Sequence, residues 1–119
     1  MKFYEYKSCS TCKKAQKFLE SKKQKFEVIP IVENPPTLTE LKKMLAFIKQ
    51  DEGTLKNLFN TSGELYREMK ISVKLPSMTE TDALKLLSKH GKLIKRPFLL
   101  SERFGLVGFN EELWKKRFK

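Results

Sequence analysis

The first third of the chain contains the pattern that most constrains the fold. Residues 2–7 carry aromatic side chains in a weak alternation, as expected for a strand, and residues 9–11 form a short polar loop. From Cys12 onward apolar side chains recur at helical spacing, and residues 26–32 predict a second strand. Two strands joined by one helix form a parallel βαβ unit, so the polar loop should directly precede the first turn of the helix. The apolar face of this helix comprises Ala15, Phe18 and Leu19.

The middle of the chain, residues 37–91, predicts a block of helices with no strand between them. Thr37 and Glu40 have the spacing of a capping box. Gly91 suits the position that follows the last turn of a helix. The expected helices run from Thr37 to near Gly53, from Thr54 to Phe59, from Leu65 to Met69 and from Thr79 to Gly91.

The last third of the chain returns to strands. Residues 97–100 and 106–109 predict two short apolar strands, which the turn at 102–105 would join as a hairpin. Asn110 is placed to cap a final helix. The apolar side chains of this helix are Leu113, Trp114 and Phe118. The order βαβ, helical insert, ββα predicts an α/β fold with a mixed sheet, in one domain of 119 residues with the insert at about 37–91.

The chain is strongly basic, with 25 Lys and Arg residues against 14 Asp and Glu residues and a net charge of +11. This excess has two interpretations. A basic surface would suit an acidic protein, an anionic substrate or nucleic acid, whereas a general lysine bias would serve only solubility. The lysines are spread along the chain and no recognised nucleic-acid motif accompanies them. We therefore favour the lysine bias and expect no direct sequence-specific binding of nucleic acid.

Neither a metal site nor a membrane segment is expected. Two cysteines and one histidine, His90, fall short of the four ligands of a structural zinc site. His90 precedes an expected helix end, where a favourable interaction with the helix dipole is its favoured role. No apolar run approaches the roughly 20 residues of a membrane span, and the N-terminus lacks the apolar stretch of a signal peptide. We expect a soluble cytoplasmic protein without a membrane partner.

Cys9 and Cys12 form a C-x-x-C pair at the junction of the predicted loop and helix. Backbone N–H groups and the positive end of the helix dipole stabilise a thiolate there, and Lys13 and Lys14 add positive charge. Because the thiolate is the nucleophile, we predict Cys9 as the attacking residue and Cys12 as the resolving thiol. The alternative is that Cys12 only fills a small position in the core. A cytosolic C-x-x-C pair within a βαβ unit favours the redox role.

Arg96 and Pro97 form the second candidate feature. A proline directly before a strand is a place that suits a cis peptide bond. If this loop lies opposite the cysteines, Arg96 offers a bidentate fork to an oxyanion bound at Cys9. Pairing of Arg96 with a surface acid such as Glu102 is an equal alternative.

Five segments, taken together and in order, resemble the ArsC/Spx family. They are residues 6–15 (YKSCSTCKKA), 33–37 (ENPPT), 59–68 (FNTSGELYRE), 93–97 (LIKRP) and 107–111 (VGFNE). The first and fourth are similar to the cysteine motif and the Arg-Pro segment of the family. The second resembles the Glu-Asn-Pro-Pro segment of its arsenate reductases, the third an uncharacterised arsenate-reductase-like branch, and the fifth the Gly-Tyr-Asn-Glu stretch of the Spx branch.

The resemblance implies a thioredoxin-like fold with an inserted helical subdomain. It also implies that Cys9 aligns with the catalytic cysteine and Arg96 with an anion-binding arginine, with Pro97 as a structural residue beside the site. The residues expected to bind the anion or substrate are Arg96, Lys13, Ser10 and Thr11.

The chain departs from the family pattern at several positions. Typical glutaredoxin-dependent arsenate reductases have a serine where Cys12 stands and two further arginines, where this chain has Asn60 and Phe109. Glu5 takes the place of an upstream histidine. Arg67 is one candidate for a replacement charge.

These features lead to two functional hypotheses. The first is a thiol-dependent oxidoreductase, similar to arsenate reductases, that acts on a small oxyanion or a thiol/disulfide substrate. It would hold no bound cofactor and would depend on an external thiol reductant, either glutathione with glutaredoxin or thioredoxin. The second is a redox-sensing transcriptional regulator similar to Spx, which binds RNA polymerase.

Overall fold

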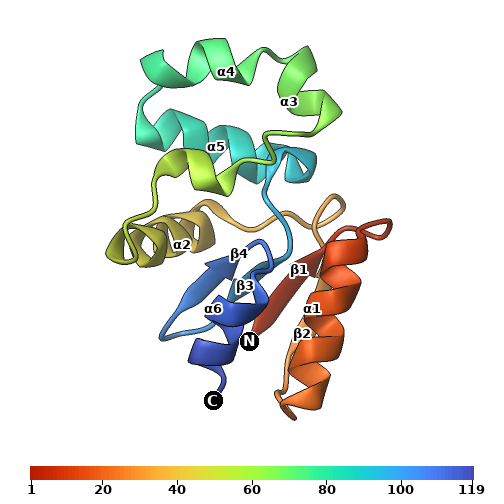
Figure 1. Cartoon of the computed structure of the whole chain (residues 1–119). Helices are drawn as coiled ribbons and strands as arrows, with labels where there is room; N and C mark the ends of the chain where they lie inside the picture. Colours follow the sequence, from red (N-terminus) through yellow and green to blue (C-terminus); the bar gives the residue numbers. More distant parts are fainter.

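The computed structural model describes residues 1–119 and has a four-stranded mixed sheet at its centre (Figure 1). In spatial order the strands are β2 (Glu27–Pro30), β1 (Lys2–Glu5), β3 (Phe98–Leu100) and β4 (Gly105–Val107). β1 and β2 are adjacent parallel strands that helix α1 (Ser10–Ser21) connects, whereas the β1–β3 and β3–β4 pairs are antiparallel. The predicted βαβ and ββα halves are therefore confirmed, and β2, which ends at Pro30, is an edge strand of the sheet.

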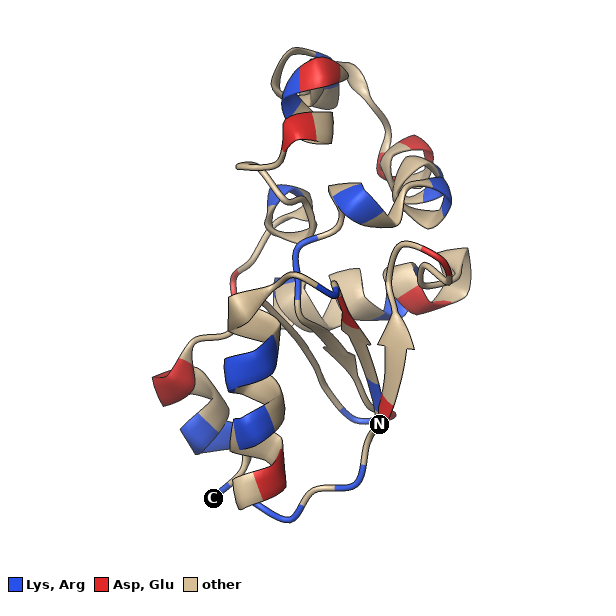
Figure 2. Ribbon diagram, turned by 90° about the vertical axis from the view of Figure 1, so that its right-hand side faces the viewer, with Lys and Arg blue, Asp and Glu red and all other residues tan.

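The side chains of the sheet alternate between two cores. Phe3 and Leu99, which are partners in the register of β1 and β3, face α1 and α6 (Glu111–Arg117). Their neighbours Tyr4 and Phe98 face the opposite side, where α2 (Leu38–Gln50) and the rest of the helical block cover the sheet. Figure 2 shows α1 and α6 side by side on their shared face. This two-residue alternation of strands is the reason that the molecule has a core on each face.

Between β2 and β3 the chain is helical, as predicted. In Figure 1 α2 lies beside β4, and the other helices of this block lie further from the sheet. The predicted caps at Thr37 and Asn110 are present: Thr37 and Glu40 form a reciprocal capping box, and the side chain of Asn110 accepts the N–H of Leu113. The helix predicted from Thr79 is capped by the side chain of this residue, which accepts the N–H of Asp82. Besides α2, the block contains α3 (Glu64–Glu68), α4 (Ile71–Lys74), α5 (Glu80–Lys89) and 3₁₀ turns at Leu55–Leu58, Leu75–Ser77 and Gly91–Leu93.

Several predicted boundaries are wrong by a few residues. Helix α1 begins at Ser10 rather than at Cys12, because Cys9 acts as its N-cap. The predicted strand at 106–109 is β4 at Gly105–Val107, because Gly108 takes a left-handed φ of 70° and ends the strand. The helix predicted from Thr54 is only a 3₁₀ turn, and α4 was not predicted.

Two side-chain expectations also change. Helix α5 ends before Gly91 as predicted, but Gly91 does not adopt the left-handed conformation of a typical C-terminal glycine. A Cβ atom at this position would lie 1.9 Å from the carbonyl oxygen of Ile31, so a close approach of two backbone segments requires the glycine. The expectation that Leu113 faces the core is wrong, since its side chain is 54% exposed while Trp114 and Phe118 form the buried stripe of α6.

Candidate active site

Cys9 lies at the end of β1 where the chain turns into α1. Its N–H donates to the carbonyl of Tyr6 at 3.0 Å, which closes the turn between strand and helix. Its sulfur accepts the backbone N–H of Cys12 at 3.1 Å, so the thiol itself caps the helix. The Cys9 side chain is half-buried, and both cysteines are free thiols. The sulfur is therefore held by the backbone at a place that a substrate can reach.

Cys12 lies behind Cys9 and is fully buried, in the core that α1 and α6 share with Phe3 and Leu99. Burial, together with the hydrogen bond to Cys9, raises the pKa of the Cys12 thiol to about 12, although Arg96 acts in the opposite direction. Cys12 thus stays protonated at neutral pH. The buried Cys12 and the half-buried Cys9 therefore lie in different environments, which suits two different chemical tasks.

Arg96 lies over the ring of Tyr6, with 4.2 Å between the guanidinium carbon and the ring centroid. Its side chain makes no salt bridge, so the alternative that pairs Arg96 with Glu102 is wrong. The Arg96–Pro97 peptide bond is cis. Stacking on an aromatic ring leaves the N–H donors of the guanidinium available to a ligand.

Two hollows meet at Arg96, one on each side of its side chain. We call them the outer hollow and the insert-side hollow. The outer hollow, of about 400 Å³, is lined by Thr11, Lys95, Arg96, Val107, Gly108, Phe109 and Asn110. The insert-side hollow, of about 410 Å³, is lined by Tyr6, Asn60, Gly63, Glu64, Leu65, Glu68, Lys92 and Arg96. Arg96 is the only residue that contributes to both hollows, so it lies where the sheet half and the helical block meet.

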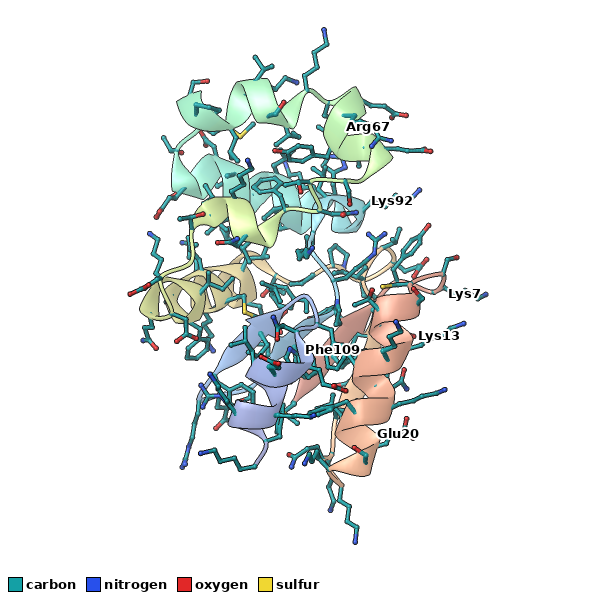
Figure 3. All side chains as sticks on the ribbon, in the orientation of Figure 1. Lys7, Lys13, Glu20, Arg67, Lys92 and Phe109 are labelled. Atoms are coloured by element: carbon teal, nitrogen blue, oxygen red, sulfur yellow. The ribbon has the colours of Figure 1, made fainter.

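The other residues predicted to bind the anion lie on α1. Ser10, Thr11 and Lys13 are all exposed in its first turn, and Thr11 shares the outer hollow with Arg96. Figure 3 shows Lys13 at the upper end of α1, pointing away from the sheet toward solvent. The structure therefore brings Thr11 and Arg96 together, while Lys13 contributes charge at the margin of the site.

The positions at which the chain lacks family arginines have other tasks. The ring centroid of Phe109 lies 5.8 Å from that of Phe18 and 5.0 Å from that of Trp114. Phe109 therefore belongs to the core as well as to the lining of the outer hollow. Asn60 lines the insert-side hollow and receives no replacement charge from Arg67. The guanidinium of Arg67 instead donates to the carbonyl of Ser62 at 3.1 Å. Arg96 is the one arginine that lines these hollows.

Sequence reasoning missed Tyr6, which lies three residues before Cys9 and supports Arg96. An aromatic residue directly before the loop is the only signal for this role, and an aromatic at the end of a strand is more simply assigned to the core. His90 is the C-cap residue of α5 and lines neither hollow, and its interaction with the helix dipole stays a prediction.

The largest hollow of the molecule, about 840 Å³, lies elsewhere. Its lining includes Lys2, Glu40 and Arg103 at the opposite end of β1 from Cys9, and it contains no cysteine. None of the residues predicted for the site lines this depression. No cysteine lines the hollows at Arg96 either, but Thr11, the neighbour of Cys12, lines the outer hollow, and the charge of Arg96 lowers the pKa of Cys12. We therefore assign the chemistry to the side of the molecule that contains Arg96. No group of three or more His, Cys, Asp or Glu side chains is arranged to hold a metal ion. None of the helices is both long enough and apolar enough to span a membrane.

The fold and the site together define a thioredoxin-like α/β protein with a C-x-x-C pair at the start of its first helix. The model of the ArsC family matches residues 4–117, and the chain belongs to this family. It is 43% identical over 110 residues to the uncharacterised protein YusI of Bacillus subtilis, with 92% of this chain and 91% of YusI covered. It is also 30% identical to the global transcriptional regulator Spx 2 of Bacillus anthracis, with 92% of this chain and 79% of Spx 2 covered.

Solved structures agree with this assignment. An ArsC family related protein from Bacteroides fragilis superposes with a TM-score of 0.86 at 44% identity, covering 97% of this chain and 96% of its own. A protein from Streptococcus mutans, described as "a possible arsenate reductase", superposes with a TM-score of 0.82 at 34% identity, covering 96% of both chains. The predicted family and the thioredoxin-like fold are therefore both confirmed, and the relatives include both a transcriptional regulator and the protein described as "a possible arsenate reductase".

Proposed function

We propose that the chain is a thiol–disulfide oxidoreductase in which Cys9 is the nucleophile and Cys12 is the resolving thiol. The observation that carries this proposal is the contrast between the two thiols. Cys9 is reachable and its sulfur accepts a helix N–H, whereas Cys12 is fully buried directly behind it. A cytoplasmic location, where thiols are kept reduced, is part of the proposal.

The proposed reaction has two exchange steps. The Cys9 thiolate attacks one sulfur of a substrate disulfide, the substrate S–S bond breaks, and the other substrate sulfur leaves as a thiolate. Cys12 then loses its proton and attacks the Cys9 sulfur of the mixed disulfide, which releases the second substrate thiolate. The chain is left with a Cys9–Cys12 disulfide, and an external dithiol or pair of thiols, such as thioredoxin or glutathione with glutaredoxin, supplies the two electrons that restore it.

The order of these steps follows from the ionisation of Cys12. Burial is the first cause of its raised pKa, but the hydrogen bond to Cys9 and the charge of Cys9 also raise the pKa. Both contributions from Cys9 disappear once the Cys9 sulfur is bonded to a substrate. The nearby Arg96, which lowers the pKa, remains. Formation of the mixed disulfide therefore eases deprotonation of Cys12, so the resolving step becomes easier only after the first attack.

The same residues suit an anionic substrate. Under the proposal Arg96 binds the anion with its fork of donors, and Ser10, Thr11 and Lys13 in the first turn of α1 add N–H groups and charge. Arsenate is the anion suggested by the family and by the Streptococcus mutans protein. With a single arginine beside the hollows, we expect disulfides to be better substrates than arsenate.

The proposal is tested by steady-state turnover of arsenate, a mixed disulfide and the disulfides of insulin in the presence of each thiol reductant. Cys9→Ser should abolish turnover of every substrate. Cys12→Ser should accumulate a stable mixed disulfide at Cys9, which mass spectrometry detects as the added mass of half the substrate. Full activity of Cys9→Ser would refute the proposal, and unchanged turnover by Cys12→Ser would remove Cys12 from the cycle.

The similarity to Spx 2 favours a second candidate function. In this version the Cys9–Cys12 disulfide acts as a switch, and the partner is RNA polymerase. Capture of RNA polymerase by the chain in only one redox state would support it. Absence of capture in both states, together with turnover that depends on Cys9, would favour the oxidoreductase.

A further inference from the structure

The positive charge of the molecule is concentrated in the half that contains Cys9. Residues 1–36 and 92–119, which form the sheet, α1 and α6, contain 16 Lys and Arg residues against 7 Asp and Glu residues. The helical block at 37–91 has 9 against 7. A general lysine bias would spread the excess over both halves, so this distribution disagrees with the interpretation that we favoured from sequence alone.

Within the basic half, seven of the sixteen basic residues, Arg96 and six lysines, lie around the thiol and the hollows, and the others lie elsewhere in this half. Four exposed lysines lie on one side, in the loop before α1 and along the outer face of this helix, and two lie across the hollows. We call this set the basic rim. It consists of Lys7, Lys13, Lys14, Lys17, Lys92 and Lys95. None of the six takes part in a salt bridge. Figure 3 shows Lys7, Lys13 and Lys92 projecting from the same side of the molecule.

The charge order of α1 is the reverse of that in the other helices. Each of the other α-helices with five or more residues has an acidic residue in its first turn, as the helix dipole favours, whereas α1 has none and carries Lys13 and Lys14 among its first five residues. Its one acid, Glu20, lies at the far end of the helix, and the red band of α1 in Figure 2 lies at this lower end. These lysines therefore do not serve the stability of the helix.

We propose that the basic rim is a docking surface for a protein whose own disulfide is surrounded by acidic residues. This inference rests on the proposed function and names the partner class of the same site. A macromolecule brought to the rim by its charge presents its disulfide to the half-buried Cys9 sulfur, and the exchange steps then proceed as above. The carboxylates of Glu64 and Glu68, which line the insert-side hollow with Lys92, repel acidic groups, so the acidic partner lies over α1 rather than over α3.

A pair of disulfide-closed peptides tests the rim. One carries four glutamates around the disulfide, and its twin carries four lysines. At low ionic strength we expect kcat/KM for the acidic peptide to exceed that for its twin by at least about tenfold. The preference should disappear in about 0.5 M salt, because the Debye length is then only a few ångströms and the attraction between exposed charges is screened.

Two charge-reversal variants separate the rim from the net charge. The double variant Lys7→Glu with Lys17→Glu should lose the preference for the acidic peptide. The control variant Lys85→Glu with Lys89→Glu changes the net charge by the same amount at two exposed lysines of α5. It should keep the preference for the acidic peptide. Both variants should reduce the uncharged hydroxyethyl disulfide at the wild-type rate. Equal rates for the two peptides, or equal loss in both double variants, would overturn the inference.

Failure of the rim and failure of the proposed function give different results. If hydroxyethyl disulfide is reduced through Cys9 but the two peptides react equally, only the rim is refuted. If no disulfide is reduced, the proposed function fails, and the rim is tested by calorimetric binding of peptides with serine in place of cysteine. Selective binding of the acidic peptide, lost in Lys7→Glu with Lys17→Glu, would still support the inference. Binding of duplex DNA through the same two lysines, without a preference between the peptides, would reassign the surface to nucleic acid and refute the inference.

Discussion

Tyr6 offers the sharpest test of how the site holds an anion. The ring of Tyr6 lies under Arg96 at 4.2 Å, and no salt bridge competes for the guanidinium. Replacing Tyr6 with Leu removes the aromatic face but keeps an apolar side chain. Tyr6 is thus a positioning residue that acts through Arg96, and its loss should weaken the binding of anionic substrates.

The size of the effect follows from the exposure of the pair. Tyr6 and Arg96 are both half-buried, so their contact lies between the exposed and desolvated limits of a cation–π interaction, about 0.5–2 kcal/mol. At 1.36 kcal/mol for each factor of ten, this range corresponds to a loss of about 2- to 30-fold in kcat/KM. We expect the loss mainly in KM, because a mobile Arg96 weakens binding before the chemical step.

The assay compares an anionic aromatic disulfide, dithiobis(nitrobenzoate), with the uncharged hydroxyethyl disulfide. Tyr6→Leu should raise KM for the anionic substrate and leave that for the uncharged one unchanged. Tyr6→Phe keeps the aromatic face and should behave as the wild type. The reasoning is refuted if Tyr6→Phe is as defective as Tyr6→Leu, or if both substrates lose equally, since either result would indicate a structural effect on the loop before Cys9.

Three further changes test the fold. Trp114→Ala should lower the free energy of unfolding in urea by about 3–5 kcal/mol, because Trp114 is 1% exposed and packs against Phe18, Phe109 and Phe118; Leu113→Ala, at an exposed neighbour, should cost much less. Gly91→Ala should cost about 1–3 kcal/mol, because the new Cβ would meet the carbonyl of Ile31, and an unchanged urea midpoint would contradict this contact. Burial alone would favour the protonated acid of Glu40, but hydrogen bonds from Lys2, the Thr37 N–H and Tyr4 hold its pKa below the usual value. The resulting stabilisation is complete above the pKa of a glutamate in the unfolded chain, and it disappears as the pH falls through the lower pKa of Glu40 in the folded chain. Glu40→Gln should therefore lower the free energy of unfolding by about 1–3 kcal/mol at pH 7 and by progressively less in acid.

Local features of the fold were predictable, because the interactions that create them span few residues. Thr37 accepts the N–H of Glu40 three residues away, and Thr79 does the same with Asp82. The start of α1 escaped prediction because it depends on the sulfur of Cys9 acting as an N-cap, a role for which hydroxyl and carboxamide side chains are the usual candidates.

Features that depend on distant contacts were not predictable. Tyr6 and Arg96 are 90 positions apart in the chain, and only the pairing of β1 with β3 brings the loops that follow and precede these strands together. The two interpretations of Arg96 were equal from sequence for this reason. Likewise, position 91 requires a glycine because the backbone of Ile31 passes close to it. Ile31 precedes the helical block in the sequence and Gly91 ends it, so no local pattern predicts this contact.

The position of Phe109 shows why charge and packing compete at this site. It lines the outer hollow beside Arg96, yet its ring contacts Phe18 and Trp114 in the core below α1 and α6. An arginine at this position would bring a second cation to the hollow, but those aromatic contacts would be lost and part of the core would be exposed to water. Under the proposed function, the chain therefore captures its substrate with one stacked arginine and a surrounding surface of lysines. Such an arrangement favours a large acidic partner, which meets many charges at once, over a small oxyanion that must be enclosed by a few.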